Sequence, residues 1–121
     1  MQPTILTKRV YEQASSTDGY RVLVDRLWPR GLKKEKAAID EWAKDLVPTT
    51  ALREWWNHDP ALWPEFQKRY KEELRHNEAI PAFIKDHGHK KTITLVYGAK
   101  DTLHNQALVL QQYLTQQFEG G

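Results

Sequence analysis

Residues 20–32 read YRVLVDRLWPRGL, and this stretch joins a strand to a turn that carries polar side chains. Five apolar residues predict a short strand buried on both faces: Tyr20, Val22, Leu23, Val24 and Leu27. Pro29 restricts the residue before it to extended backbone and Gly31 tolerates a positive φ, so Arg30 is expected on a tight turn. Asp25 and Arg26 follow at the carboxyl end of the strand. The stretch therefore predicts a central strand and a candidate site beside it.

The rest of the chain supplies two more strands and a series of helices. Residues 92–97, TITLVY, predict a second central strand, and residues 5–10 predict a third strand. Apolar spacings of three to four residues predict helices elsewhere. The first two helices are expected from residue 33 to Pro48 and at residues 50–56, the latter with Thr49 or Thr50 as cap. A third is expected to begin at Asp59-Pro60 and to carry the apolar stripe Trp63, Phe66, Tyr70 and Leu74. A fourth contains Ile80, Phe83 and Ile84 and ends at Gly88, and a last helix follows a cap at Asp101 or Thr102. This order predicts an α/β fold over residues 1–121, a small single-domain sandwich with helices packed on a short, mainly parallel sheet.

Composition narrows the class of protein. The chain has no cysteine, which excludes disulfides, thiolate metal sites and cysteine nucleophiles and suits a reducing compartment. No apolar run approaches the ~20 residues of a membrane span, and the N-terminus lacks the apolar region of a signal peptide. We therefore expect a cytoplasmic protein that does not contact a membrane. The net charge of +2 does not by itself indicate nucleic-acid binding.

A candidate site follows from the two central strands. In open α/β sheets, ligands bind beyond the carboxyl ends of the strands. That rule brings together the polar residues at the ends of the two central strands, residues 20–27 and 92–97. These are Asp25, Arg26, Trp28 and Arg30 from the first strand end, and Gly98, Lys100, Asp101, His104 and Asn105 from the second. Arginines grip carboxylates and phosphates with paired donors, and lysine adds a point charge. The set therefore favours an anion.

Each of these side chains also has a structural interpretation. Arg26 and Arg30 can pair with nearby carboxylates inside the fold, and Trp28 can close a core instead of stacking on a ligand. His58 can transfer protons near neutral pH, or it can simply close the turn before Asp59. His87 and His89 lack a third ligand nearby, so neither a metal nor a cofactor is predicted.

Eight residues, Val24 to Gly31, together with later motifs, resemble the YeaO-like branch of the bacterial domain-of-unknown-function family 488. The further motifs are Trp42-Ala43-Lys44-Asp45-Leu46 with Pro48, Leu52-Arg53 with Trp56, His58-Asp59-Pro60, Trp63 with Phe66 and Tyr70, and Leu95-Val96-Tyr97 with Ala99-Lys100-Asp101 and Asn105. The resemblance covers essentially the whole chain and implies a compact cytoplasmic α/β domain. It adds weight to the matching polar positions: Arg26, Trp28, Arg30, Lys44, Asp45, Arg53, His58, Lys100, Asp101 and Asn105. The family often has His where this chain has Gln106, which weakens any inference of enzymatic activity.

The functional hypothesis is a pocket at the strand ends that binds an anionic small molecule carrying phosphate, such as a nucleotide. Asp25 and His58 are the catalytic candidates if the protein is an enzyme, which the sequence leaves open. The ligand-binding candidates are Arg26, Trp28, Arg30, Lys44, Arg53, Lys100, Asp101 and Asn105.

An alternative is a non-enzymatic module that binds nucleic acid or protein. Its basis is the run of cations at Arg30, Lys33, Lys34 and Lys36 beside Trp28. Exposure of Trp55 and Trp56 would instead indicate a dimer interface, so the oligomeric state stays open.

Overall fold

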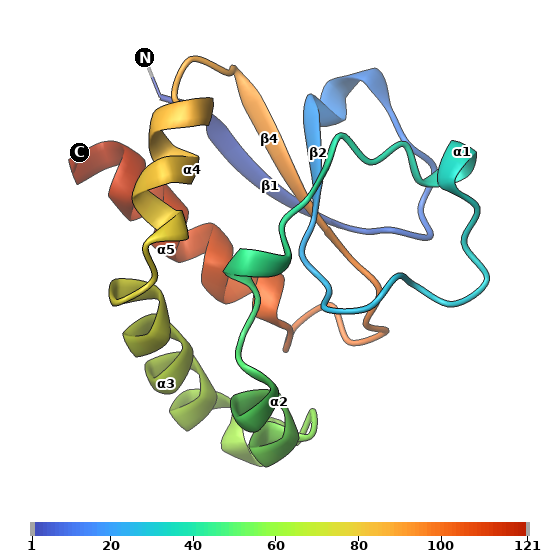
Figure 1. Ribbon diagram of the computed structural model, residues 1–121. Coiled ribbons are helices and arrows are strands. Elements are labelled where there is room, and N and C mark those ends of the chain that lie inside the picture. Colours follow the sequence, from blue (N-terminus) through green and yellow to red (C-terminus); the bar gives the residue numbers. More distant parts are fainter. Residues whose placement is uncertain (1, 121) are drawn as a thin grey trace.

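The computed structural model describes residues 2–120, and its centre is a four-stranded parallel sheet (Figure 1). The strands are β1 (Thr4–Arg9), β2 (Tyr20–Leu23), β3 (Glu41–Trp42) and β4 (Thr92–Tyr97). They lie in the order β1-β4-β2-β3, and every neighbouring pair is parallel. The prediction of an α/β fold with two central strands is confirmed, because β2 and β4 occupy the middle of the sheet.

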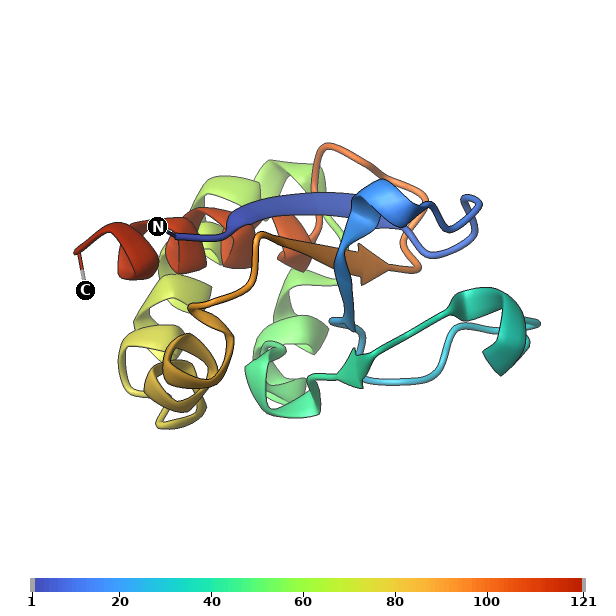
Figure 2. The same ribbon diagram turned by 90° about the horizontal axis from the view of Figure 1, so that it is seen from above.

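Four of the five α-helices gather on one side of the sheet: α2 (Thr50–Trp56), α3 (Trp63–Arg75), α4 (Ala79–His87) and α5 (Gln106–Gly120). The fifth, α1 (Lys34–Ala37), stands apart from them in both views (Figures 1 and 2). Three single-turn 3-10 helices complete the elements, at Ser16–Asp18, Lys44–Leu46 and Pro60–Leu62. Within residues 2–120, no helix has the length and apolarity needed to cross a bilayer.

The main core lies between the sheet and these four helices. The stripe predicted for α3 is confirmed, since Phe66, Tyr70 and Leu74 are all buried against the sheet. The Tyr70 hydroxyl donates to the carbonyl of Leu46, which ties α3 to the chain that enters α2. The predicted caps at Thr49, Asp59 and Gly88 are also confirmed.

The opposite face of the sheet carries a smaller apolar cluster. Leu23 and Val96 are fully buried there under Trp28 and Trp42. The two indole rings meet edge to face with centroids 5.5 Å apart, and the Trp28 Nε1–H donates to the carbonyl of Leu32 at 2.8 Å. Trp28 therefore closes this face, as in the structural interpretation of its role.

A buried ion cluster sits on the same face. Arg21 and Asp18 form an ion pair whose side chains are 4% and 7% exposed. The Lys8 ammonium lies 3.1 Å from the same carboxylate, and Arg21 also donates to the carbonyls of Ala37 and Ala38. Burial alone would raise the pKa of Asp18, but hydrogen bonds from the Ser15 N–H, Lys8 and Arg21 outweigh it and hold the pKa below its usual range. The cluster attaches residues 15–18 and 37–38 to the sheet.

A second polar cluster fastens the short edge strand β3. Glu41 accepts from the Tyr20 hydroxyl at 2.9 Å, and its Oε1 lies 2.9 Å from His87 Nε2. Burial and the Glu41 carboxylate raise the pKa of Tyr20 to about 12. The two residues of β3 are therefore held by side chains from β2 and α4 as well as by their pairing with β2.

The single helix predicted from residue 33 to Pro48 is wrong. The structure has the four-residue α1, the two-residue β3 and a single 3-10 turn instead. Ala38 adopts a left-handed conformation with φ of 49°, which ends α1. Ile39 then packs on the small cluster while Leu46 packs in the main core, so the helical spacing reflected burial on two different faces.

Two predicted boundaries are also wrong. The central strand ends at Leu23 instead of Leu27, and the Leu27 side chain is 71% exposed. The last helix begins at Gln106 instead of directly after Asp101 or Thr102. Asp101 accepts from the backbone of Leu103 in a local turn, whereas the buried Asn105 accepts from the N–H of Leu108 and caps α5.

Candidate functional site

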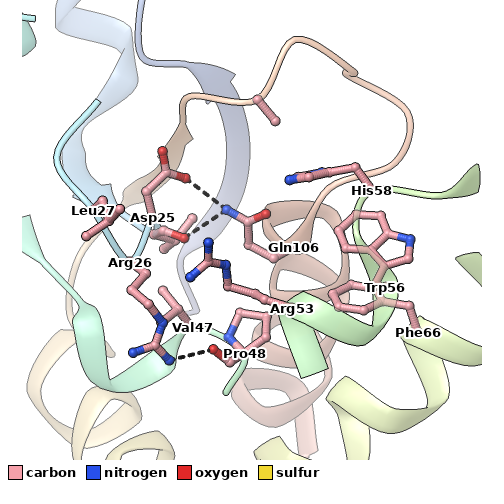
Figure 3. A pocket seen from close by; sticks show the side chains of 12 residues that line it. Asp25, Arg26, Leu27, Val47, Pro48, Arg53, Trp56, His58, Phe66 and Gln106 are labelled. Atoms are coloured by element: carbon pink, nitrogen blue, oxygen red, sulfur yellow. Dashed lines mark hydrogen bonds between the residues drawn. The ribbon is translucent and has the colours of Figure 1, made fainter. Parts of the chain in front are cut away.

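A pocket lies beyond the carboxyl end of β2, enclosed by the chain that enters α2, by α2 itself and by the start of α5 (Figure 3). Its volume is about 180 Å³. Five polar residues line it: Asp25, Arg26, Arg53, His58 and Gln106. The apolar part of the lining comes from Val24, Leu27, Val47, Pro48, Trp56, Phe66 and Ala99. The site thus lies where parallel α/β sheets usually bind ligands.

Asp25 is held from two sides. Its Oδ2 accepts from the Gly98 N–H at 2.9 Å, and its Oδ1 accepts from Gln106 Nε2, also at 2.9 Å. A Cβ on residue 98 would lie 2.8 Å from Oδ2, so the glycine leaves room for the carboxylate. Burial raises the pKa of Asp25, although these two donors and the nearby Arg53 and His58 act in the opposite direction. Asp25 is therefore a fixed acceptor with a reduced tendency to ionise.

Two arginines reach the pocket from different segments. Arg26 donates to the carbonyl of Pro48 at 2.9 Å, and its Nε–H is buried without a hydrogen-bond partner in residues 2–120. Arg53 projects from α2, and none of the hydrogen bonds among the side chains drawn in Figure 3 involves it. Arg53 and His58 therefore act on the Asp25 carboxylate, Arg26 turns toward Pro48, and the lining holds two guanidinium groups and one carboxylate.

His58 is presented by a turn in unusual backbone geometry. Asn57 and His58 have φ values of 46° and 54°, a left-handed conformation that only glycine adopts without cost. The imidazole packs on Trp56 with ring centroids 4.9 Å apart. Strained backbone of this kind is concentrated at functional sites, where it costs ~1–3 kcal/mol per residue. This turn follows the left-handed C-cap of α2 at Asn57 and holds the imidazole in the lining of the pocket.

His58→Gly should separate stability from binding. Glycine relieves the left-handed strain but gains freedom in the unfolded chain, so we expect the free energy of unfolding to stay within ~1 kcal/mol of the wild type. Binding of the anion that the sequence-based hypothesis expects should weaken, because the pocket loses its imidazole. Urea denaturation and anion titration of the same sample measure the two effects. A variant that binds the anion as tightly as the wild type would assign His58 to the turn alone.

Several predicted site residues lie outside this pocket. Arg30 is exposed, and its carbonyl accepts from the Tyr11 hydroxyl at 2.9 Å. The Lys44 ammonium lies 3.9 Å from the centroid of a Trp42 ring. Lys100 and Asp101 are exposed on the loop before α5, where the Asp101 carboxylate lies 2.9 Å from His104 Nδ1. Trp28 and Asn105 are held within the fold, as described above. The structure brings together Asp25, Arg26, Arg53 and His58, and it does not bring the others to them.

The sequence did not identify Gln106 or the aromatic floor as parts of the pocket. Gln106 Nε2 donates to the carbonyl of Val24 at 3.0 Å as well as to Asp25. The floor is Trp56 stacked on Phe66 with ring centroids 4.0 Å apart. A polar amide in the first turn of the helix after β4 was the available signal for Gln106, but the predicted cap at Asp101 or Thr102 placed that turn four or three residues too early. Within residues 2–120, no three histidine, aspartate or glutamate side chains converge to hold a metal ion.

Comparison with known proteins identifies the family. Residues 4–120 match the family model described as the inactive DUF488-N3 subclade. The chain is 44% identical over 110 residues to the uncharacterized protein YeaO of Escherichia coli K12. The aligned region covers 91% of this chain and 96% of YeaO. It is 41% identical over 106 residues to the uncharacterized protein Rv3073c of Mycobacterium tuberculosis H37Rv, covering 88% of this chain and 89% of that protein.

No solved structure matches the chain significantly. The match over residues 4–120 and the identity to YeaO confirm the resemblance seen in residues 24–31 and the later motifs. The chain is a YeaO-like member of the DUF488 family.

Proposed function

We propose that the protein binds a small anion, one that carries a phosphate or a similar oxyanion, in the pocket between Asp25, Arg26 and Arg53. The observation that carries the proposal is the approach of two guanidinium groups from separate segments to one cavity (Figure 3). Guanidinium groups form short, charge-assisted hydrogen bonds with oxyanions and often bind them with two parallel N–H donors. A bound oxyanion would also supply an acceptor near the unpartnered Nε–H of Arg26.

The size of the pocket limits the ligand. Pockets for drug-sized molecules usually enclose ~300–1,000 Å³, whereas this one encloses about 180 Å³. A phosphate-sized group fits such a volume, but a whole nucleotide does not. We therefore propose that a nucleotide or sugar phosphate would insert only its phosphate and leave the remainder at the mouth, near the exposed Leu27.

We propose binding without turnover as the simplest use of the site. The description of the matched subclade as inactive supports this choice. Asp25 and His58 would then contact the ligand or set the charge of the pocket instead of transferring protons. The cytoplasmic location expected from the absence of cysteine agrees with access to phosphorylated metabolites.

Arg53→Ala should abolish most of the anion affinity with little change in stability. A ligand at about 100 times its dissociation constant raises the free energy of unfolding by ~2.7 kcal/mol, which a thermal shift detects. Loss of a hydrogen bond to a charged group costs ~1.5–3 kcal/mol, so affinity should fall ~10- to 100-fold. Inorganic phosphate, a sugar phosphate and a nucleotide are the probes.

Arg75→Ala is the matched control, since Arg75 is an exposed arginine on α3 that pairs with Glu72 of the same helix. It should bind each probe as the wild type does. Equal affinities in wild type and Arg53→Ala would exclude this pocket as the binding site.

A nucleic-acid-binding function is the second candidate, and one observation favours it. Arg30, Lys33, Lys34 and Lys36 are all exposed on the projecting segment that carries α1 (Figure 1). Trp28 does not contribute a stacking surface, because it packs on Trp42. Binding to a phosphate backbone should weaken steeply with salt and require the three lysines. A shift produced only by oligonucleotides, lost in a variant without those lysines, would favour this candidate over the pocket.

A further inference from the structure

We infer that the pocket selects oxyanions that retain an O–H group, such as hydrogen phosphate, over fully deprotonated ones such as sulfate. The inference rests on the proposed function, because it concerns which anion the same pocket accepts. It follows from the acceptors that share the lining with the two arginines. These are the carboxylate of Asp25 and the side-chain oxygen of Gln106.

The orientation of the Gln106 amide is fixed by its neighbours. Its Nε2 lies 3.0 Å from the carbonyl oxygen of Val24 and 2.9 Å from Oδ1 of Asp25, and both of these atoms are acceptors. A flipped amide would place its own oxygen against two other oxygens, so only the observed orientation gives favourable hydrogen bonds. The Oε1 atom therefore points away from Asp25 and toward the side of the pocket where His58 lies (Figure 3).

Asp25 also keeps capacity to accept. Each carboxylate oxygen receives one hydrogen bond, from Gly98 and from Gln106 respectively. A carboxylate offers about four lone-pair sites, so further donors can be accommodated. The pocket therefore has a donor half, formed by Arg26 and Arg53, and an acceptor half, formed by Asp25 and Gln106.

Hydrogen phosphate and sulfate differ mainly in one proton. Both are tetrahedral and of similar size, and once phosphate has lost its second proton both are doubly charged, so the arginines attract them about equally. The O–H of hydrogen phosphate can donate to Asp25 or to Gln106 Oε1. Sulfate would place a bare oxygen against the same acceptors, which leaves them unpaired and adds repulsion from the carboxylate. Sites that hydrogen-bond a ligand hydroxyl discriminate strongly against analogues that lack it.

The same logic separates classes of phosphate ligand. The second ionisation of a phosphate monoester has a pKa near 6, so its dianion has no O–H in neutral solution. Inorganic hydrogen phosphate keeps one O–H over the same range. We therefore expect inorganic phosphate to bind more tightly than monoesters above pH ~6, and the two to converge as the pH falls below that value.

The test is a calorimetric titration of the full chain with phosphate, arsenate and sulfate at matched ionic strength and neutral pH. Phosphate and arsenate, which both keep an O–H, should bind at least ~10-fold more tightly than sulfate, a difference of about 1.4 kcal/mol. In Asp25→Asn, the preference should shrink to within a few-fold, mainly because sulfate binds better. Asp45→Asn is the matched control, since Asp45 is exposed and lies outside this pocket, and it should keep the wild-type preference.

The outcomes separate this inference from the proposed function. Equal binding of phosphate and sulfate by the wild type overturns the selectivity while leaving the anion pocket in place. Failure of every anion to bind overturns the proposed function itself. If Asp25→Asn does not fold, Gln106→Met removes the second acceptor and should also reduce the preference. A Gln106→Met variant and an Asp25→Asn variant that both keep the wild-type ratio would contradict the role assigned to the acceptor half.

Discussion

Arg21→Met is expected to lower the free energy of unfolding by ~3–5 kcal/mol, because it leaves the buried carboxylate of Asp18 without its closest counter-ion. The same change removes the hydrogen bonds to the carbonyls of Ala37 and Ala38. A domain of this size usually has a stability of ~5–15 kcal/mol, so the loss is a large share of the total. Urea denaturation followed by tryptophan fluorescence measures the difference.

The loss should depend on pH in a defined direction. The pKa of Asp18 is lowered in the folded state, so its ionised form adds stability above the unfolded pKa of ~3.9, and this stability disappears as the pH falls through the folded pKa. The difference between wild type and Arg21→Met should therefore be full near neutral pH and smaller in acid, where Asp18 is protonated in both proteins.

Arg69→Met supplies the control. Arg69 forms an exposed ion pair with Glu65 on α3, in which both side chains are about half exposed. Such pairs contribute less than ~1 kcal/mol. An Arg21→Met variant that loses no more stability than Arg69→Met would show that Lys8, which is 3.1 Å from Asp18, compensates the carboxylate by itself.

The parts of the fold that sequence predicted well are those in which one local pattern serves one buried surface. Residues 92–97 are all β-branched, leucine or tyrosine and form β4 with the expected bounds, because β4 is covered on both faces. The apolar stripe of α3 faces a single core, so the spacing of its apolar residues predicted both the helix and which of its residues are buried. The capping bonds of Thr49 and Asp59 go to backbone N–H groups two or three residues further on, and both caps were also predicted.

Residues 33–48 were predicted wrongly because their apolar residues serve two surfaces. Trp42 belongs to β3 and packs with Trp28, whereas Leu46 enters the main core on the other side. The left-handed turn at Ala38 that separates these surfaces has no glycine or asparagine to mark it. The ion cluster around Arg21 is what holds that turn, and its partners are distant in the sequence.

For the site, a cavity does lie at the strand end to which the rule for α/β sheets pointed, but the rule did not select among the candidate residues. Asp25 and Arg26 directly follow β2 and reach the pocket. Lys100 and Asp101 follow β4 equally closely in sequence, but their loop turns outward before α5 begins. Gln106 takes the place those residues were expected to fill. The predicted arrangement, with Lys100 and Asp101 at the pocket, and the observed one, with Gln106 there, differ in the position of the α5 cap, which is Asn105.

The floor of the pocket belongs to the hydrophobic core, and Phe66→Ala tests the connection. Phe66 is fully buried, stacks on Trp56 and also lies 5.7 Å, centroid to centroid, from the rings of Trp63 and Tyr70. Truncating a buried phenylalanine costs ~3–5 kcal/mol, because the transfer free energy of the ring is lost and a cavity remains. Urea denaturation measures the loss. Phe118→Ala is the matched control, since Phe118 is only partly buried beside the core.

The proposed anion binding should weaken together with stability in Phe66→Ala. The Trp56 ring loses the surface on which it stacks. His58 packs on that same Trp56 ring, so the loss of Phe66 also reaches the imidazole. Phe66→Leu keeps most of the volume and should cost less than ~1.5 kcal/mol while retaining affinity. If Phe66→Ala is destabilised as expected but binds phosphate as tightly as the wild type, the aromatic floor supports the fold alone. The anion would then be held by the arginines and the strand end without help from the core beneath them.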